Sequence, residues 1–175
     1  MTEELSLYAG DSLETVVDLY GKMIYRLAYA KTSNIHDAED IMQEVFLRYA
    51  KIGKEGKIFE SEEHRKAWLL RVTVNCSKTA LRSSWNKRRS HEELDENTPS
   101  SDLSMDRADT KLSIRKAVAA LSEKYRIIIH LYYFEELSAK EVSDIVGVSE
   151  NAVKTRLNRA RNKLREILKE VDFNG

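Results

Sequence analysis

Six polar side chains between positions 154 and 161 have the types and spacing to bind DNA. At about 100° per residue, the apolar side chains of Val153, Leu157, Ala160 and Leu164 fall in one narrow arc of a predicted helix. Lys, Arg, Thr and Asn side chains hydrogen-bond to base edges and phosphates in the major groove. On the opposite arc and its margins lie Lys154, Thr155, Arg156, Asn158, Arg159 and Arg161.

The segment that must position these residues, 137–169, predicts two helices joined by a tight turn. Ser138 with Glu141 forms a capping box at the first helix, and Gly147 ends that helix in a left-handed conformation. Ser149 then caps the second helix. The first helix buries Val142, Ile145 and Val146. Because caps, glycine and both helix faces agree, a helix-turn-helix is favoured over a basic, solvated helix at the end of a bundle.

A second group of candidate nucleic-acid contacts lies on a long helix predicted for 64–89. Residues 65–90 contain eight basic side chains and no acidic one. The stripe on one side of this helix includes Arg71, Asn75, Lys78 and Arg82. A basic stripe with aromatic neighbours suits opened or single-stranded nucleic acid, where bases stack and phosphates pair. Trp68, at its margin, either stacks on a base or packs against a neighbouring helix.

The helix predicted for 35–51 carries a candidate protein-binding face. Its apolar side is Ala38, Ile41, Val45 and Tyr49. The other side holds Asp40, Gln43, Glu44 and Leu47. A leucine among carboxylates is unusual for a purely solvated face, although single exposed leucines are common. We therefore expect this face to bind a protein.

Two further segments complete the first half of the chain. Asp11 with Glu14 predicts a capping box for a first helix over 11–31, with Leu13 on its buried face. Residues 52–63 predict a loop in which Phe59 either anchors the segment to the core or contacts a ligand.

The chain of 175 residues has no net charge, but its charges lie in separate blocks. Residues 91–110 are acidic and contain the only proline, which predicts a flexible linker between domains 1–90 and 111–175. In the second domain a helix from 111 buries Ile114, Ala117, Val118 and Leu121, and Ser122 caps another that reaches about residue 134. Together these patterns predict an all-α protein of two small helical domains with a C-terminal helix-turn-helix.

The sequence contains no motif that indicates enzyme chemistry or metal binding. Cys76 is the only cysteine and lies on the apolar side of its helix, so it reads as a core residue. The four histidines lack metal-ligand spacing, and no phosphate-binding glycine loop occurs. We expect no metal, no cofactor and no catalytic residue. Because no segment resembles a signal peptide or a membrane span, we expect a cytoplasmic protein without membrane insertion.

Three motifs taken together resemble bacterial sigma factors of the extracytoplasmic-function group of the sigma-70 family. They are DAEDIMQEVFLR (37–48), AWLLRVTVNCSKTALR (67–82) and LSEKYRIIIHLYYFEELSAKEVSDIVGVSENAVKTRLNRARNKLRE (121–166). The resemblance covers about residues 13–168. It implies a two-domain helical protein that binds core RNA polymerase and gives it promoter specificity, and that has an anti-sigma factor as a further partner.

The resemblance also implies roles for the candidate residues. Region 2 would be 1–90 and region 4 would be 111–175. The polymerase contacts would be Asp40, Gln43, Glu44 and Leu47. The contacts to the opened −10 element would be Phe59, Trp68, Arg71, Asn75, Lys78 and Arg82. The contacts to the −35 duplex would be Lys154, Thr155, Arg156, Asn158, Arg159 and Arg161. The acidic linker would enter the polymerase channel that later holds RNA.

Two alternatives remain in view. A stand-alone helix-turn-helix regulator would not need the acidic face at 40–47 or the stripe at 71–89, and it would usually need a dimer interface. A helical adaptor that binds only proteins would not need basic stripes on two separate helices.

Overall fold

The computed structural model describes residues 11–57, 59–90 and 108–173, and every regular element in them is helical. The chain divides into two compact units, Met1–Glu96 and Asn97–Gly175. The all-α fold predicted from the sequence is confirmed. The predicted linker spans this division, and its residues 91–107 lie outside the described part of the chain.

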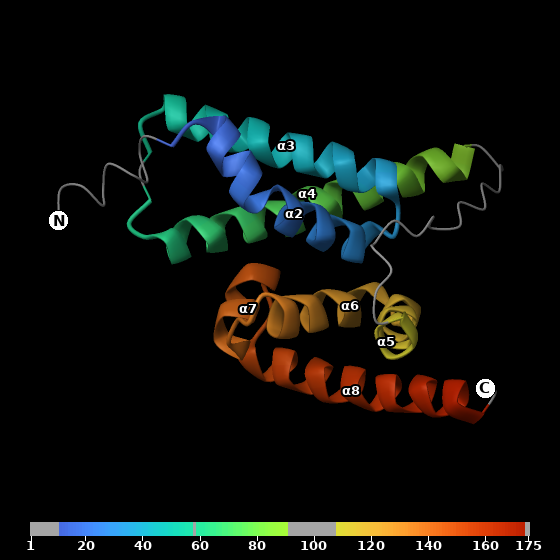
Figure 1. Ribbon diagram of the computed structural model, residues 1–175. Coiled ribbons are helices and arrows are strands. Elements are labelled where there is room, and N and C mark those ends of the chain that lie inside the picture. The colour runs from blue at the N-terminus through green and yellow to red at the C-terminus, as the bar shows by residue number, and fades with distance from the viewer. Residues whose placement is uncertain (1–10, 58, 91–107, 174–175) are drawn as a thin grey trace. The chain divides into compact units, whose positions relative to one another are not determined.

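The first unit is a bundle of three helices, α2 (Leu13–Thr32), α3 (Ile35–Lys54) and α4 (Glu62–Ser90). Each helix packs against the other two (Figure 1). The short connections force successive helices to run in opposite directions. Apolar side chains from all three meet between them: Val16, Ile24, Ala28, Ala38, Ile41, Val45, Leu69 and Cys76.

Helix α2 begins one residue later than its predicted cap. Ser12, not Asp11, is the N-cap, and its hydroxyl accepts a hydrogen bond from the backbone N–H of Thr15. The predicted capping box of Asp11 with Glu14 is therefore wrong. Leu13 was expected in the core but is 42% exposed, because it lies in the first turn, outside the bundle.

Helices α3 and α4 both extend further than the sequence pattern predicts. Helix α3 continues to Lys54, and the backbone then turns through Gly56, whose φ of 74° is in the left-handed region that glycine tolerates. Helix α4 is buried on more than the predicted face, since Leu70, Thr73, Val74 and Ser77 are also inaccessible. The hydroxyls of Thr73 and Ser77 donate to carbonyls four residues earlier, at 2.7 Å each, so neither is buried without a partner.

The second unit is built along α8 (Glu150–Phe173), against which α5 (Ala108–Ala120), α6 (Glu123–Ile129) and α7 (Ala139–Val146) all pack. Residues 108–110, assigned to the linker from sequence, belong to the first turn of α5. Ile114 was expected to be buried but is 43% exposed, whereas Ala117 and Leu121 are in the core as predicted.

Helix α6 passes directly into a π-helical turn, η1 (His130–Phe134), which the sequence pattern did not reveal. In this turn the backbone N–H of Glu135 donates to the carbonyl of His130, five residues earlier, at 3.1 Å. The wider turn lets Leu131 remain in the core while Tyr133 faces solvent.

The helix-turn-helix is present with its predicted caps. Ser138 and Glu141 form a reciprocal capping box, with N···O distances of 3.2 and 2.7 Å. Gly147 closes α7 at a φ of 77°, and the hydroxyl of Ser149 accepts from the backbone N–H of Ala152 at the start of α8. Val153, Leu157 and Ala160 are buried, which fixes the rotation of α8 about its axis.

No helix within the described ranges is long and apolar enough to cross a membrane. In the same ranges no three His, Cys, Asp or Glu side chains come together in a way that could hold a metal ion.

Candidate functional site

The polar face of α3, defined as Asp40, Gln43, Glu44 and Leu47, is exposed along its length. Leu47 is 66% exposed, so the leucine among carboxylates lies on the surface as expected. The opposite side of the helix is buried through Ala38, Ile41 and Val45. Because the bundle core fixes the rotation of α3, these four side chains form one continuous outward row.

One member of this face takes part in an ion pair. Glu44 Oε1 accepts from Arg48 Nε at 2.7 Å, one turn further along α3, and both side chains are about half exposed. The pair lies close to Cys76 of α4. Burial raises the pKa of the Cys76 thiol, Arg48 lowers it and Glu44 raises it, with a net rise. The thiol is thus neutral and buried, as expected for a core residue.

The stripe on α4, defined as Arg71, Asn75, Lys78 and Arg82, is exposed at all four positions. No hydrogen bond joins the Asn75 side chain to another residue in the described part of the chain; the hydroxyl of Thr79 donates only to its backbone carbonyl. Its amide therefore offers both a donor and an acceptor to a ligand. Three positive charges around one neutral amide give a surface with the chemistry to pair with phosphates and to hydrogen-bond a base edge.

The loop before α4 is fixed by an aromatic cluster. The Phe59 ring lies 6.0 Å from Tyr49, 5.7 Å from Trp68 and 5.4 Å from His64, measured between centroids. Phe59 is only 6% exposed. Phe59 therefore anchors the loop to the core of the bundle and is not exposed to contact a ligand.

Trp68 is half-buried and joins the same cluster, with its ring 6.2 Å from Tyr49 in an edge-on arrangement. The structure therefore displays packing for this residue as well. Phe59 and Trp68 hold the loop against α3 and α4, while the α4 stripe is left open beside it.

Arg65 was counted in the basic block, yet it is the most deeply buried charged residue described. Its side chain is 2% exposed, and it donates to Asp11 and Glu62 at 2.7 Å each and to the Tyr49 hydroxyl at 3.5 Å. Burial opposes the charge, but these hydrogen bonds outweigh burial and raise the pKa of the guanidinium. Arg65 therefore joins helices and is not available to nucleic acid.

The polar face of α8 is exposed at Lys154, Thr155, Asn158 and Arg159, while Arg156 and Arg161 are half-buried at its margins. Lys154 pairs with Glu150 at 3.0 Å, and both groups remain largely exposed. Arg161 is held by a tyrosine from η1. The six predicted residues thus lie on one side of one helix, as the spacing indicated.

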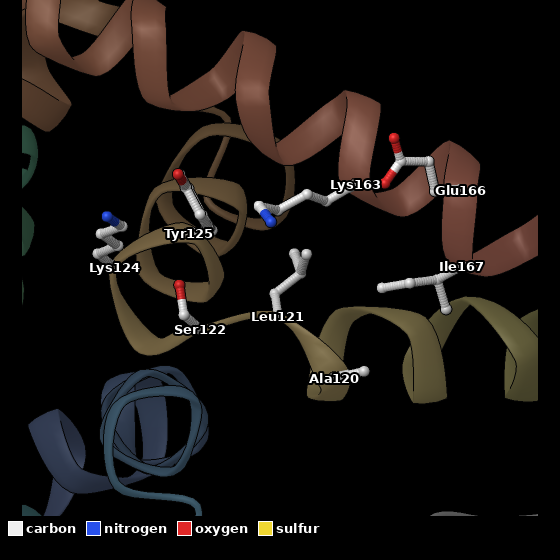
Figure 2. Close-up of a pocket in the computed structure, with 8 residues that line it drawn as sticks. All are labelled: Ala120, Leu121, Ser122, Lys124, Tyr125, Lys163, Glu166 and Ile167. Atoms are coloured by element: carbon white, nitrogen blue, oxygen red, sulfur yellow. The ribbon is translucent and has the colours of Figure 1, made fainter.

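A separate cavity of about 490 Å³ lies in the second unit, between the α5–α6 turn and α8 (Figure 2). Three of its lining residues form cation–π contacts: Lys124 Nζ and Lys163 Nζ lie 5.0 and 5.9 Å from the centroid of the Tyr125 ring. None of the predicted site residues lines this cavity. Its lining comprises Ala120, Leu121, Ser122, Lys124, Tyr125, Lys163, Glu166 and Ile167.

Comparison with known proteins identifies a family region in each half of the chain. Residues 16–87 match the family model for sigma-70 region 2, and residues 111–164 match the model for sigma-70 region 4. The first match contains the α3 face and the α4 stripe, and the second contains α6, α7 and the polar face of α8.

Curated relatives match over nearly the whole chain. The RNA polymerase sigma factor SigV of Bacillus subtilis is 30% identical over 163 residues, covering 92% of this chain and 93% of that protein. The ECF RNA polymerase sigma factor SigW of the same organism is 29% identical over 181 residues, covering 92% and 91%. The fold resembles that of the sigma factor RpoE of Bartonella quintana, with a TM-score of 0.74, 23% identity and coverage of 89% and 96%. This chain belongs to the sigma-70 family and, within it, to the extracytoplasmic-function RNA polymerase sigma factors.

Proposed function

We propose that this chain binds core RNA polymerase through the α3 face, reads the opened −10 element with the α4 stripe, and reads the −35 duplex with α8. It acts in the cytoplasm, as an initiation factor without catalytic activity of its own. The observation that carries the promoter-reading part is the exposed polar side of α8, opposite buried Val153, Leu157 and Ala160 in a fully capped helix-turn-helix.

The α3 face supports the polymerase contact. Exposed Leu47 supplies apolar area, and Asp40 and Glu44 supply charge that would steer a basic partner surface. The face is rigid because the same helix contributes Ile41 and Val45 to the core. A rigid, mixed apolar and acidic row suits a stable but selective protein contact.

The α4 stripe supports the −10 contact. Arg71, Lys78 and Arg82 provide phosphate-binding charge, and Asn75 provides hydrogen-bonding groups for a base edge that is accessible only after strands separate. We assign Phe59 and Trp68 an indirect role: they anchor the loop that borders the stripe. In this proposal an extruded base meets the loop surface, not the buried Phe59 ring.

The solved relative from Bartonella quintana is a complex of a sigma factor with the anti-sigma factor NepR. We propose that an anti-sigma factor also binds this chain and competes with polymerase for its exposed surfaces. The stand-alone regulator is not favoured, because both sigma-70 regions match and together they account for both halves of the chain.

The decisive experiment is reconstituted transcription. Core RNA polymerase with and without the chain is given a pool of duplex templates, and transcript 5′ ends are mapped. We expect the chain to produce start sites that share a −10 and a −35 sequence and that are absent with core polymerase alone. Specific duplex binding by the isolated chain without any polymerase-dependent start sites would instead support a stand-alone regulator.

A further inference from the structure

Arg161 of α8 is bonded to a side chain outside its own helix. Its Nε donates to the Tyr133 hydroxyl of η1 at 2.6 Å. The guanidinium carbon lies 5.6 Å from the Tyr133 ring centroid and 5.9 Å from that of Tyr132. The two tyrosine rings meet nearly at right angles, with centroids 5.0 Å apart. Two neighbouring side chains of η1 thus hold one arginine of the proposed recognition helix.

The π-helical turn explains how consecutive tyrosines reach the same arginine. Leu131 is fully buried, whereas Tyr133 is 49% exposed and Tyr132 is intermediate, so the pair lies at the rim of the core beside α8. Tyr133 is half exposed, so packing in the core does not account for a tyrosine at this position. Its hydroxyl instead accepts a hydrogen bond from Arg161.

The hydrogen-bond donors that remain on Arg161 point to a ligand. A guanidinium has five N–H donors and no acceptor. Tyr133 takes the Nε–H, and no other described residue accepts from the two Nη groups. Those two groups form the end of the fork, which fits two oxygens of a phosphate or two acceptors on a base edge.

We propose that Tyr133 is a positioning residue for promoter recognition, because it orders the Arg161 side chain before DNA arrives and leaves both Nη groups directed to the duplex. This inference rests on the proposed role of α8. A side chain that is ordered before binding loses less conformational entropy when DNA binds. For one long side chain this difference corresponds to about three- to tenfold in affinity.

The test uses the full chain bound to core RNA polymerase. The probe is a duplex fragment that the wild-type holoenzyme selects from a random-sequence pool. Tyr133→Phe removes only the hydroxyl, and Tyr132→Phe makes the same change on the adjacent ring, which has no hydroxyl bond to Arg161 in the described contacts. We expect Tyr133→Phe to weaken duplex binding by about three- to tenfold and Tyr132→Phe to leave it unchanged.

Two further readouts separate positioning from a general structural effect. In an Arg161→Ala background, Tyr133→Phe should cause no additional loss, because the side chain it positions is gone. Tyr133→Phe should also leave the slope of log affinity against log salt unchanged, since no charge is removed, whereas disturbance of the whole α8 surface would lower that slope. A full-sized effect in the Arg161→Ala background, an equal loss in Tyr132→Phe, or no loss in Tyr133→Phe would each overturn the proposal.

The outcome also distinguishes this inference from the proposed function. If Arg159→Ala weakens duplex binding and Arg161→Ala does not, the positioning role is overturned while α8 remains the duplex-reading helix. If neither arginine affects binding, the assignment of α8 to the −35 duplex fails, and the role of Tyr133 fails with it.

Discussion

Arg65 Nη1 and Asp11 Oδ2 are joined across 2.7 Å, although the two residues lie 54 positions apart in the sequence. Asp11 directly precedes the N-cap of α2, and Arg65 lies in the first turn of α4. The same guanidinium contacts Glu62, the Tyr49 hydroxyl and the Tyr20 ring, whose centroid is 5.4 Å away. One buried cation therefore connects all three helices at the end of the bundle that carries the loop before α4.

Removing this cation should destabilise the first unit. Loss of one partner of a buried ion pair costs about 3–5 kcal/mol, and we expect about 3 kcal/mol for Arg65→Met because Glu62 is partly exposed. The measurement is urea unfolding of the full chain, followed by circular dichroism. Arg48→Met is the matched control: its pair with Glu44 is about half exposed, so its loss should cost less than about 1 kcal/mol. Similar costs for both variants would show that Arg65 has no special structural role.

The role of Arg65 could not be predicted from sequence. The residues that follow it up to position 90 include seven basic and no acidic side chains, so pattern alone places it in a nucleic-acid-binding block. Only tertiary structure brings Asp11 and Tyr49 to it. By contrast, the caps of the helix-turn-helix were predictable, because each capping side chain bonds to a residue only three positions away in the sequence.

The faces of the functional helices were predictable for a related reason. Periodicity gave the exposed α3 and α8 residues correctly, since buried and exposed sides alternate with the helical repeat. It failed at Leu13, which lies in the first turn of α2, and at Ile114 in the middle of α5; both side chains are more than 40% exposed. It also failed at η1, because a π-helical turn changes the repeat, and so the contact of Tyr133 with Arg161 was missed.

The capping box of α7 gives a second stability prediction. Ser138→Ala removes a side-chain oxygen that accepts from the Glu141 backbone N–H, and it should destabilise the second unit by about 1 kcal/mol. Ser122 occupies the N-cap of α6 without such a bond, so Ser122→Ala should cost clearly less. Thermal unfolding of the full chain, read for both variants, provides the comparison. If Ser122→Ala proved as costly as Ser138→Ala, the side-chain cap would not explain the effect.

The α3 face predicts a charge-sensitive polymerase contact. Glu44→Lys should weaken binding to core RNA polymerase by about 2 kcal/mol or more, because it places a positive charge against a basic partner surface. Its fold should remain intact, since Glu44 is exposed and its pair with Arg48 contributes little. The measurement is competition with the labelled wild-type chain for core polymerase.

A charge-matched variant tests whether the effect is local. Asp18 is exposed on α2, so Asp18→Lys makes the same change of charge away from the proposed docking row. It should compete for polymerase almost as well as the wild type. Equal weakening by both variants would point to net charge and would remove the α3 face from the docking surface.

The two DNA-reading surfaces should fail in different ways. Arg159 is exposed on α8, and a bidentate arginine–guanine contact is worth about 1–3 kcal/mol. Arg159→Ala should therefore weaken binding to the closed duplex and relax selectivity at one −35 base pair. Asn75 on α4 offers an unused donor and acceptor, which suit a base edge exposed only after strand separation. Asn75→Ala should leave duplex −35 binding nearly intact and impair promoter opening.

Templates that are already unpaired across the −10 element separate these defects. On such templates the free energy of unpairing no longer has to come from protein contacts. Transcription by Asn75→Ala should then recover in part, because its contact is needed mainly to drive opening. Arg159→Ala should not recover, because its contact lies in the upstream duplex, which is unchanged. The measurement is transcription by each holoenzyme from duplex and pre-opened versions of the same promoter. Equal recovery of the two variants, or recovery of neither, would show that α4 and α8 do not divide the work of recognition in this way.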